Sequence, residues 1–164
     1  MKVRPHLLAT ALLATCTTAS AQSPGDYHLY FAEAFTQYGQ SIEDCETLRE
    51  TKQPPSANVL EELRQYDPQN VRVFLVYNDY KRMQNCSSDA ATQLLIAAGS
   101  LKNEDNLLEE TRESIKALEG LLFLRTDLDY EMKYRALPSA MRNELEGVDY
   151  FQTPYKAFSV IDEL

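Results

Sequence analysis

The stretch DYHLYFAEAFTQYGQSIEDCETL, residues 26–48, decides the fold class. Its apolar side chains recur at steps of three and four residues, at Phe31, Ala34, Phe35, Tyr38, Ile42, Cys45 and Leu48. The polar side chains fall on the opposite side, at Glu33, Gln37, Gln40, Asp44 and Thr47. This spacing has the period of an amphipathic α-helix, which Asp26 can cap and which must end before Pro54-Pro55.

Helix start signals continue along the rest of the chain. Residues that suit an N-cap or a first helical turn occur at Ser56, Asp67-Pro68, Ser87-Ser88-Asp89, Asn103, Pro138-Ser139 and Thr153-Pro154. We expect the step at 87–89 to separate a helix over about 68–84 from one over about 90–98, and a long helix to run from 103 towards 137. The sequence therefore predicts an all-α fold, an irregular antiparallel bundle of six or seven helices with one disulfide.

The first 21 residues have the layout of a cleaved export signal. Lys2 and Arg4 precede an apolar run over 7–14, and Ala19 and Ala21 supply the small side chains of the cleavage site. The apolar run is far shorter than the roughly 20 residues that cross a bilayer. We therefore predict a signal peptide and no membrane span.

Cleavage after Ala21 leaves residues 22–164 as a single helical domain in the periplasm or outside the cell. One alternative stays open at Cys16, which follows a short apolar segment as the lipidated cysteine does in bacterial lipoprotein signals. Lipidation there would anchor the same domain to a membrane.

The charge of the mature chain indicates which partners it favours. Loss of Lys2 and Arg4 with the signal lowers the formal net charge from -9 to -11. Such a field repels phosphate backbones and attracts cationic groups, so we expect a protein partner of basic character and no nucleic acid.

Cleavage also leaves Cys45 and Cys86 as the remaining thiols and His28 as the remaining imidazole. An even pair of cysteines in an exported chain predicts a disulfide. Two thiols without Cys-x-x-Cys spacing and a single imidazole fall short of a redox motif or a tetrahedral metal site. We therefore predict no metal ligand and no cofactor.

Most catalytic arrangements are excluded because they need more than one histidine or a motif that the chain lacks. The sequence contains no His-Glu-x-x-His motif, no Gly-x-Ser-x-Gly elbow and no Gly-rich phosphate loop. Carboxylates remain as acid/base groups, in pairs such as Glu61/Glu62 and Glu109/Glu110, but catalysis needs a carboxylate turned into a cleft. We predict no catalytic residue, and the sequence favours a protein that is not an enzyme.

Ten tyrosines and no tryptophan give the chain many side chains that suit a protein interface. Tyr27, Tyr30, Tyr150 and Tyr155, near the two ends of the mature chain, are our candidate interface residues. We expect an exported, acidic, non-enzymatic protein-binding module of the bacterial envelope, of the inhibitor, immunity or adaptor type. Three alternatives stay open: a carboxylate-dependent enzyme acting on peptidoglycan or another envelope polymer, a periplasmic chaperone, and a homo-oligomer.

Overall fold

The computed structural model describes residues 24–104, 107–122 and 126–164. These residues form seven α-helices and one 3-10 helix, which confirms the all-α prediction. In chain order they are α1 (Pro24–Thr51), α2 (Ala57–Leu63), α3 (Pro68–Lys102), α4 (Glu109–Leu122), α5 (Thr126–Arg135), α6 (Ser139–Glu146), η1 (Asp149–Gln152) and α7 (Ala157–Asp162). The predicted signal, with Cys16, Ala19 and Ala21, lies outside the described residues.

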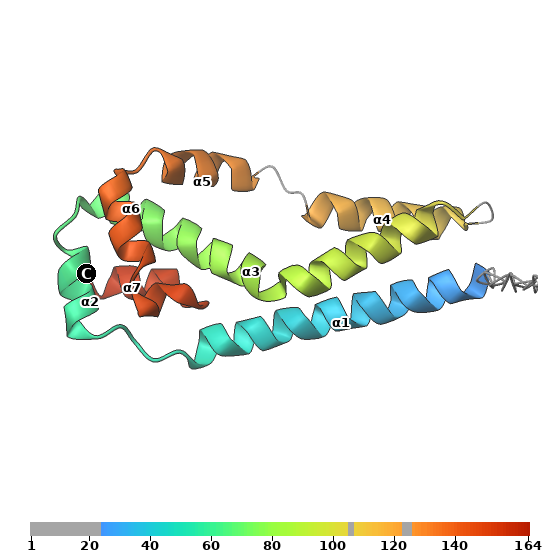
Figure 1. Ribbon diagram of the computed structural model, residues 1–164, viewed down its shortest axis with the longest axis horizontal. Coiled ribbons are helices and arrows are strands. Elements are labelled where there is room, and N and C mark those ends of the chain that lie inside the picture. Colours follow the sequence, from blue (N-terminus) through green and yellow to red (C-terminus); the bar gives the residue numbers. More distant parts are fainter. Residues whose placement is uncertain (1–23, 105–106, 123–125) are drawn as a thin grey trace, which may run out of the picture.

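The molecule is elongated because its two longest helices, α1 and α3, run antiparallel along its length (Figure 1). At one end the short helices gather around the first half of α3, and at the other α4 lies along the second half of α3 (Figure 1). We call the described residues of 24–45 and 86–122 the arm, and the remaining described residues, 46–85 and 126–164, the head.

Local capping explains where α2 and α3 begin. The Ser56 side chain accepts a hydrogen bond from the Val59 amide at 3.5 Å, as predicted for the start of α2. Asp67 Oδ1 accepts from the amides of Gln69 and Asn70, at 3.0 and 3.1 Å. Pro68 follows Asp67 at the first turn of α3, where its missing N–H costs nothing.

The predicted break at 87–89 is wrong, because α3 runs without interruption from Pro68 to Lys102. The Ser87 hydroxyl donates to the Met83 carbonyl at 3.3 Å, and the Ser88 hydroxyl donates to the Asn85 carbonyl at 3.0 Å. Serines that bond back to the preceding turn are tolerated inside a helix, and packing on both sides of the step holds it helical. Cys86 therefore lies inside α3 and not at its end.

Two other boundaries differ from the predictions. The long helix expected over 103–137 is replaced by α4 and α5, with residues 123–125 outside the described part of the chain. The last helix begins at Ala157, and the segment before it is extended, with the Tyr155 amide donating to the Asp79 side chain at 3.3 Å. This tertiary hydrogen bond replaces the helical start expected at 153–154.

A disulfide joins Cys45 of α1 to Cys86 of α3, with sulfur atoms 2.07 Å apart and Cα atoms 6.0 Å apart, which confirms the predicted pair. Both cysteines lie at the end of the arm that meets the head, so the bond fixes the register of the two long helices there. Within the described ranges, no helix is both long enough and apolar enough to cross a bilayer.

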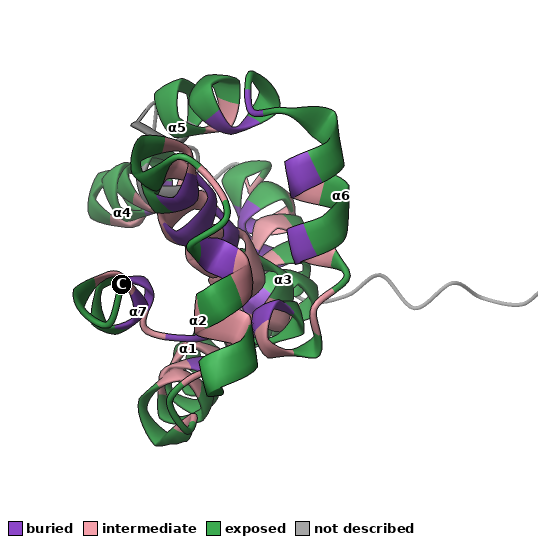
Figure 2. Ribbon diagram, turned by 90° about the vertical axis from the view of Figure 1, so that its left-hand side faces the viewer, coloured by how far each residue is buried: buried purple, intermediate pink, exposed green. Residues whose placement is uncertain are grey.

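The head contains the largest hydrophobic core (Figure 2). Aromatic rings pack at its centre, and the Phe74 ring meets the Phe151 ring edge-on at a centroid distance of 5.4 Å. The buried residues of this core are Leu63, Val71, Phe74, Leu75, Tyr134, Leu137, Met141, Leu145, Phe151, Tyr155, Ala157 and Val160. The buried residues of the arm are smaller on average and form two clusters, with Ala98, Leu101, Leu107 and Ile115 in one and Ala34, Leu94 and Ala97 in the other.

Candidate functional site

A cleft of about 360 Å³ lies in the head between α1, α3 and α7. Asp79 of α3 faces this cleft and is partly buried, unlike the exposed Glu61, Glu109 and Glu110 that the sequence offered. Sequence reasoning missed Asp79 because its burial depends on α7, which is distant along the chain. Because it is partly buried and faces a cleft, Asp79 is the carboxylate whose surroundings best favour a raised pKa.

Burial raises the pKa of the Asp79 carboxyl, and this effect outweighs three opposing ones. The amides of Tyr155 and Ala157 and the guanidinium of Arg49 all favour the ionised form. Burial also lowers the pKa of the neighbouring Lys52 ammonium, with the Asp79 charge acting in the opposite direction.

The charged groups around the cleft hold the chain that leads into α7. Lys52 Nζ donates to the Tyr150 carbonyl and, at 3.1 Å, to the Thr153 carbonyl. Arg82 Nε donates to the Phe151 carbonyl at 2.7 Å. Together with the Asp79 hydrogen bond, these contacts fasten residues 150–155 to α3 and to Lys52, which directly follows α1. The cluster therefore anchors the fold, and its second carboxylate, Glu50, is paired with Lys156.

The raised pKa of Asp79 predicts an unusual pH dependence of stability. The folded protein holds this proton more tightly than the unfolded chain, whose Asp pKa is about 3.9, so the contribution is fully present below that value. It is lost as the pH rises through the folded pKa. Relative to Asp79→Asn, which does not titrate, the wild type should gain stability from about pH 7 to about pH 4. Urea denaturation of both proteins measures this difference, and a difference that shrinks on acidification contradicts the prediction.

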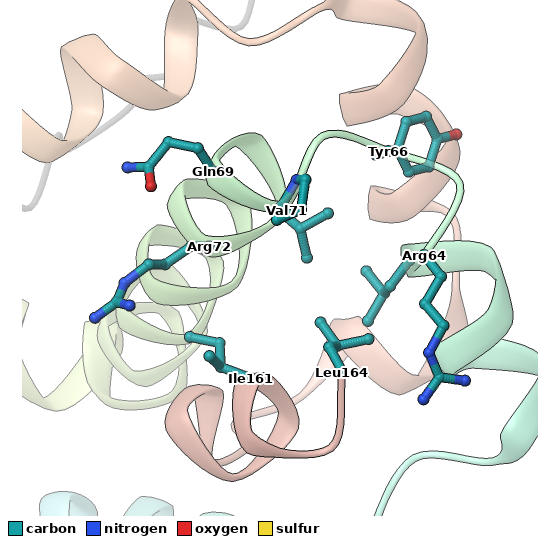
Figure 3. A pocket seen from close by; sticks show the side chains of 9 residues that line it. Arg64, Tyr66, Gln69, Val71, Arg72, Ile161 and Leu164 are labelled. Carbon is teal, nitrogen blue, oxygen red and sulfur yellow. The ribbon is translucent and has the colours of Figure 1, made fainter.

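A second cavity, of about 380 Å³, lies between the α2–α3 turn and α7 (Figure 3). Apolar side chains of Leu63, Val71, Ile161 and Leu164 line it, and Arg64 and Arg72 extend on opposite sides (Figure 3). Its volume falls in the range of ligand pockets. Sequence reasoning missed this site because its two walls are joined only by the tertiary fold.

The four candidate interface tyrosines form two pairs that lie far apart, and in one pair the Tyr150 and Tyr155 rings pack together. Tyr27 and Tyr30 are near the start of α1, whereas Tyr150 packs beside Lys52, just beyond the other end of that helix. A helix of this length puts roughly 35 Å between the two pairs. Tyr155 is 0% exposed, and its hydroxyl donates to the Leu75 carbonyl at 2.8 Å. The Tyr155 ring therefore belongs to the core and is not available to a partner in this structure.

The fold distributes charge unequally between the two ends. The described arm has ten acidic and three basic residues, a net charge of -7, while the described head has fourteen acidic and ten basic residues, a net charge of -4. The arm also exposes large apolar side chains, with Leu29 at 72% and Leu108 at 70%. Phe35, Ile96 and Tyr30 are further exposed aromatic or apolar side chains of the arm.

Metal ligation finds no support in the described part of the chain, where no three His, Cys, Asp or Glu side chains are grouped to hold an ion. His28 is exposed on α1.

Comparisons with protein-family models, with curated proteins and with solved structures find no match to this chain.

Proposed function

We propose that this protein is an exported, non-enzymatic binding module of the bacterial envelope, and that its acidic arm binds a basic partner protein. The observation that carries the proposal is the excess of acidic over basic residues in the arm, ten against three. A surface of one charge sign steers a partner of the opposite sign and raises its rate of association. The disulfide fits an oxidising compartment such as the periplasm or the extracellular space.

Exposed apolar side chains on the arm support a protein as the partner. Leu29, Phe35 and Leu108 are more than half exposed, and they lie within the acidic surface. Protein interfaces combine apolar anchors with a charged, solvated rim, and a basic surface on the partner would complete this arrangement. Tyr30 of the candidate interface lies on the same helix and is 38% exposed.

The contacts of Asp79 in its cleft fit a structural role better than a catalytic one. The Asp79 carboxylate already accepts from the amide of Tyr155, and the adjacent Glu50 is ion-paired with Lys156. General acid/base chemistry needs a carboxyl group within reach of a substrate proton. The contacts of Asp79 are explained by fastening α7, so we favour binding over catalysis.

Site-specific photo-cross-linking in the native envelope tests the proposal. A photoreactive residue at position 29 or 108 of the arm should give adducts with a basic protein, and these adducts should fade at high salt. Positions 128 and 132 of α5 are matched controls, since Leu128 and Met132 are exposed to a similar degree in the head. Adducts in equal yield from the control positions, or none from the arm, would refute the proposal.

A further inference from the structure

We infer that the cavity of Figure 3 is a docking site for an acidic segment of a partner protein, which inserts one aliphatic or aromatic side chain between Arg64 and Arg72. This site lies in the head, and it does not depend on what the arm binds.

The lining of the cavity suits an apolar side chain. Leu63 and Val71 belong to the lining and are almost fully buried. Ile161 and Leu164 lie across the cavity from Val71 (Figure 3). Filling an apolar cavity with a side chain removes its surface from water and is favourable. The volume of about 380 Å³ places this cavity at the small end of ligand pockets, which fits an inserted side chain.

Both charged side chains that line the cavity are arginines. Arg72 is exposed and makes no hydrogen bond or ion pair with any residue of the described ranges. Arg64 Nη2 donates to the Glu163 carbonyl at 2.9 Å, which leaves its remaining N–H groups for a ligand. Guanidinium groups bind carboxylates through paired hydrogen bonds, so the rim is complementary to acidic residues.

Among the acidic residues near the cavity, Glu62 and Glu144 act on Tyr66, another lining residue. Asp67, next to the lining residue Pro68, is occupied in capping the amides of Gln69 and Asn70. The Glu163 side chain lines a different cavity, together with Lys52 and Lys156. The net negative charge elsewhere is screened, because the Debye length is about 8 Å at physiological salt. Arg64 and Arg72 are the charged side chains that line the cavity itself.

The placement of the arginines favours a peptide over a small acid. They extend on opposite sides of the cavity, so a ligand that reaches both needs an anionic group on each side of its apolar part (Figure 3). A peptide with acidic residues before and after one apolar residue has this arrangement. A buried anchor surrounded by charged contacts is also typical of binding hot spots.

NMR titration of the full mature chain with the peptide acetyl-Glu-Asp-Phe-Asp-Glu-amide tests the inference. Methyl signals of Val71, Ile161 and Leu164 should shift in a saturable way. The affinity should fall about tenfold or more when Gln and Asn replace the acids of the peptide, or when the protein carries Arg64→Gln with Arg72→Gln. The variant Arg112→Gln with Arg135→Gln has the same change in net charge elsewhere on the surface and should bind like the wild type.

Four results would overturn the inference. The first is equal binding of the acidic and neutral peptides, and the second is no saturable shift up to about 1 mM peptide. The third is binding of decanoate at the same methyl groups with an affinity that both arginine changes leave intact, since this indicates a site for small amphiphiles. The fourth is self-association of the wild type, seen by sedimentation and abolished by the double arginine variant, since this indicates the acidic arm of a second copy as the occupant.

Discussion

Reduction of the Cys45–Cys86 disulfide lowers the free energy of unfolding by about 4 kcal/mol. The two cysteines are 41 residues apart, and the bond removes the entropy that a loop of this length gains in the unfolded chain. In this fold the bond joins the two helices that run the length of the molecule. Losing it therefore loosens the register of α1 against α3 as well.

Urea denaturation with and without a thiol reductant measures this effect. A variant with Cys45→Ala and Cys86→Ala serves as the control, because the reductant should leave its unfolding curve unchanged. It should also lie near the reduced wild type in stability, apart from the small cavity left at the buried Cys45. A loss of less than about 1 kcal/mol on reduction would show that the packing of α1 on α3 holds the register without the bond.

Tyr155→Ala lowers the free energy of unfolding by about 3–5 kcal/mol, because it opens a large cavity in the core of the head. The Tyr155 ring packs at 5.3 Å from the Phe151 ring and at 5.6 Å from the Tyr150 ring, measured between centroids. Its hydroxyl donates to the Leu75 carbonyl, and its amide donates to Asp79. Tyr155 therefore links η1 to α3.

Two further variants distinguish the contribution of the Tyr155 ring to stability from that of its hydroxyl, and a core tyrosine from a surface one. Tyr155→Phe keeps the ring and should cost about 1 kcal/mol, the net value of a typical hydrogen bond. Tyr30→Ala, at a partly exposed position of α1, loses a hydrogen bond to Gln93 at 3.2 Å and should cost about 1 kcal/mol. Thermal and urea denaturation compare the three. A Tyr155→Ala variant as stable as Tyr30→Ala would contradict the placement of Tyr155 in the core.

The parts of the fold that follow from neighbouring residues could be predicted from the sequence. Ser56 and Asp67 cap α2 and α3 through amides two or three residues away, so their sequence signals were sufficient. Ser87 and Ser88 also resemble the start of a helix in the sequence, but in the structure they lie inside α3. Packing along α3 keeps that step helical, and such packing depends on residues far away in the chain.

The candidate sites could be predicted less well, because they depend on which distant segments meet. Asp79 is half-buried only where α7 covers it, and the cavity between Arg64 and Arg72 exists only because Ile161 packs opposite Val71. No sequence pattern distinguishes the buried Tyr155 from the exposed Tyr30. The total charge of the chain could be counted from the sequence. The concentration of negative charge in the arm could not, because it depends on the pairing of α1 with the second half of α3.

The salt dependence of affinity for the cross-linked partner tests the central claim most directly. Two variants with equal changes in net charge are compared: Glu33→Gln, Glu43→Gln and Glu113→Gln in the arm, and Glu61→Gln, Asp129→Asn and Asp162→Asn in the head. All six side chains are exposed, so both variants should fold. We predict that the arm variant binds about tenfold or more weakly at low salt and loses less affinity as salt is added, while the head variant follows the wild type. Equal weakening by both variants, or an affinity independent of salt, would contradict a binding surface built on the acidic arm.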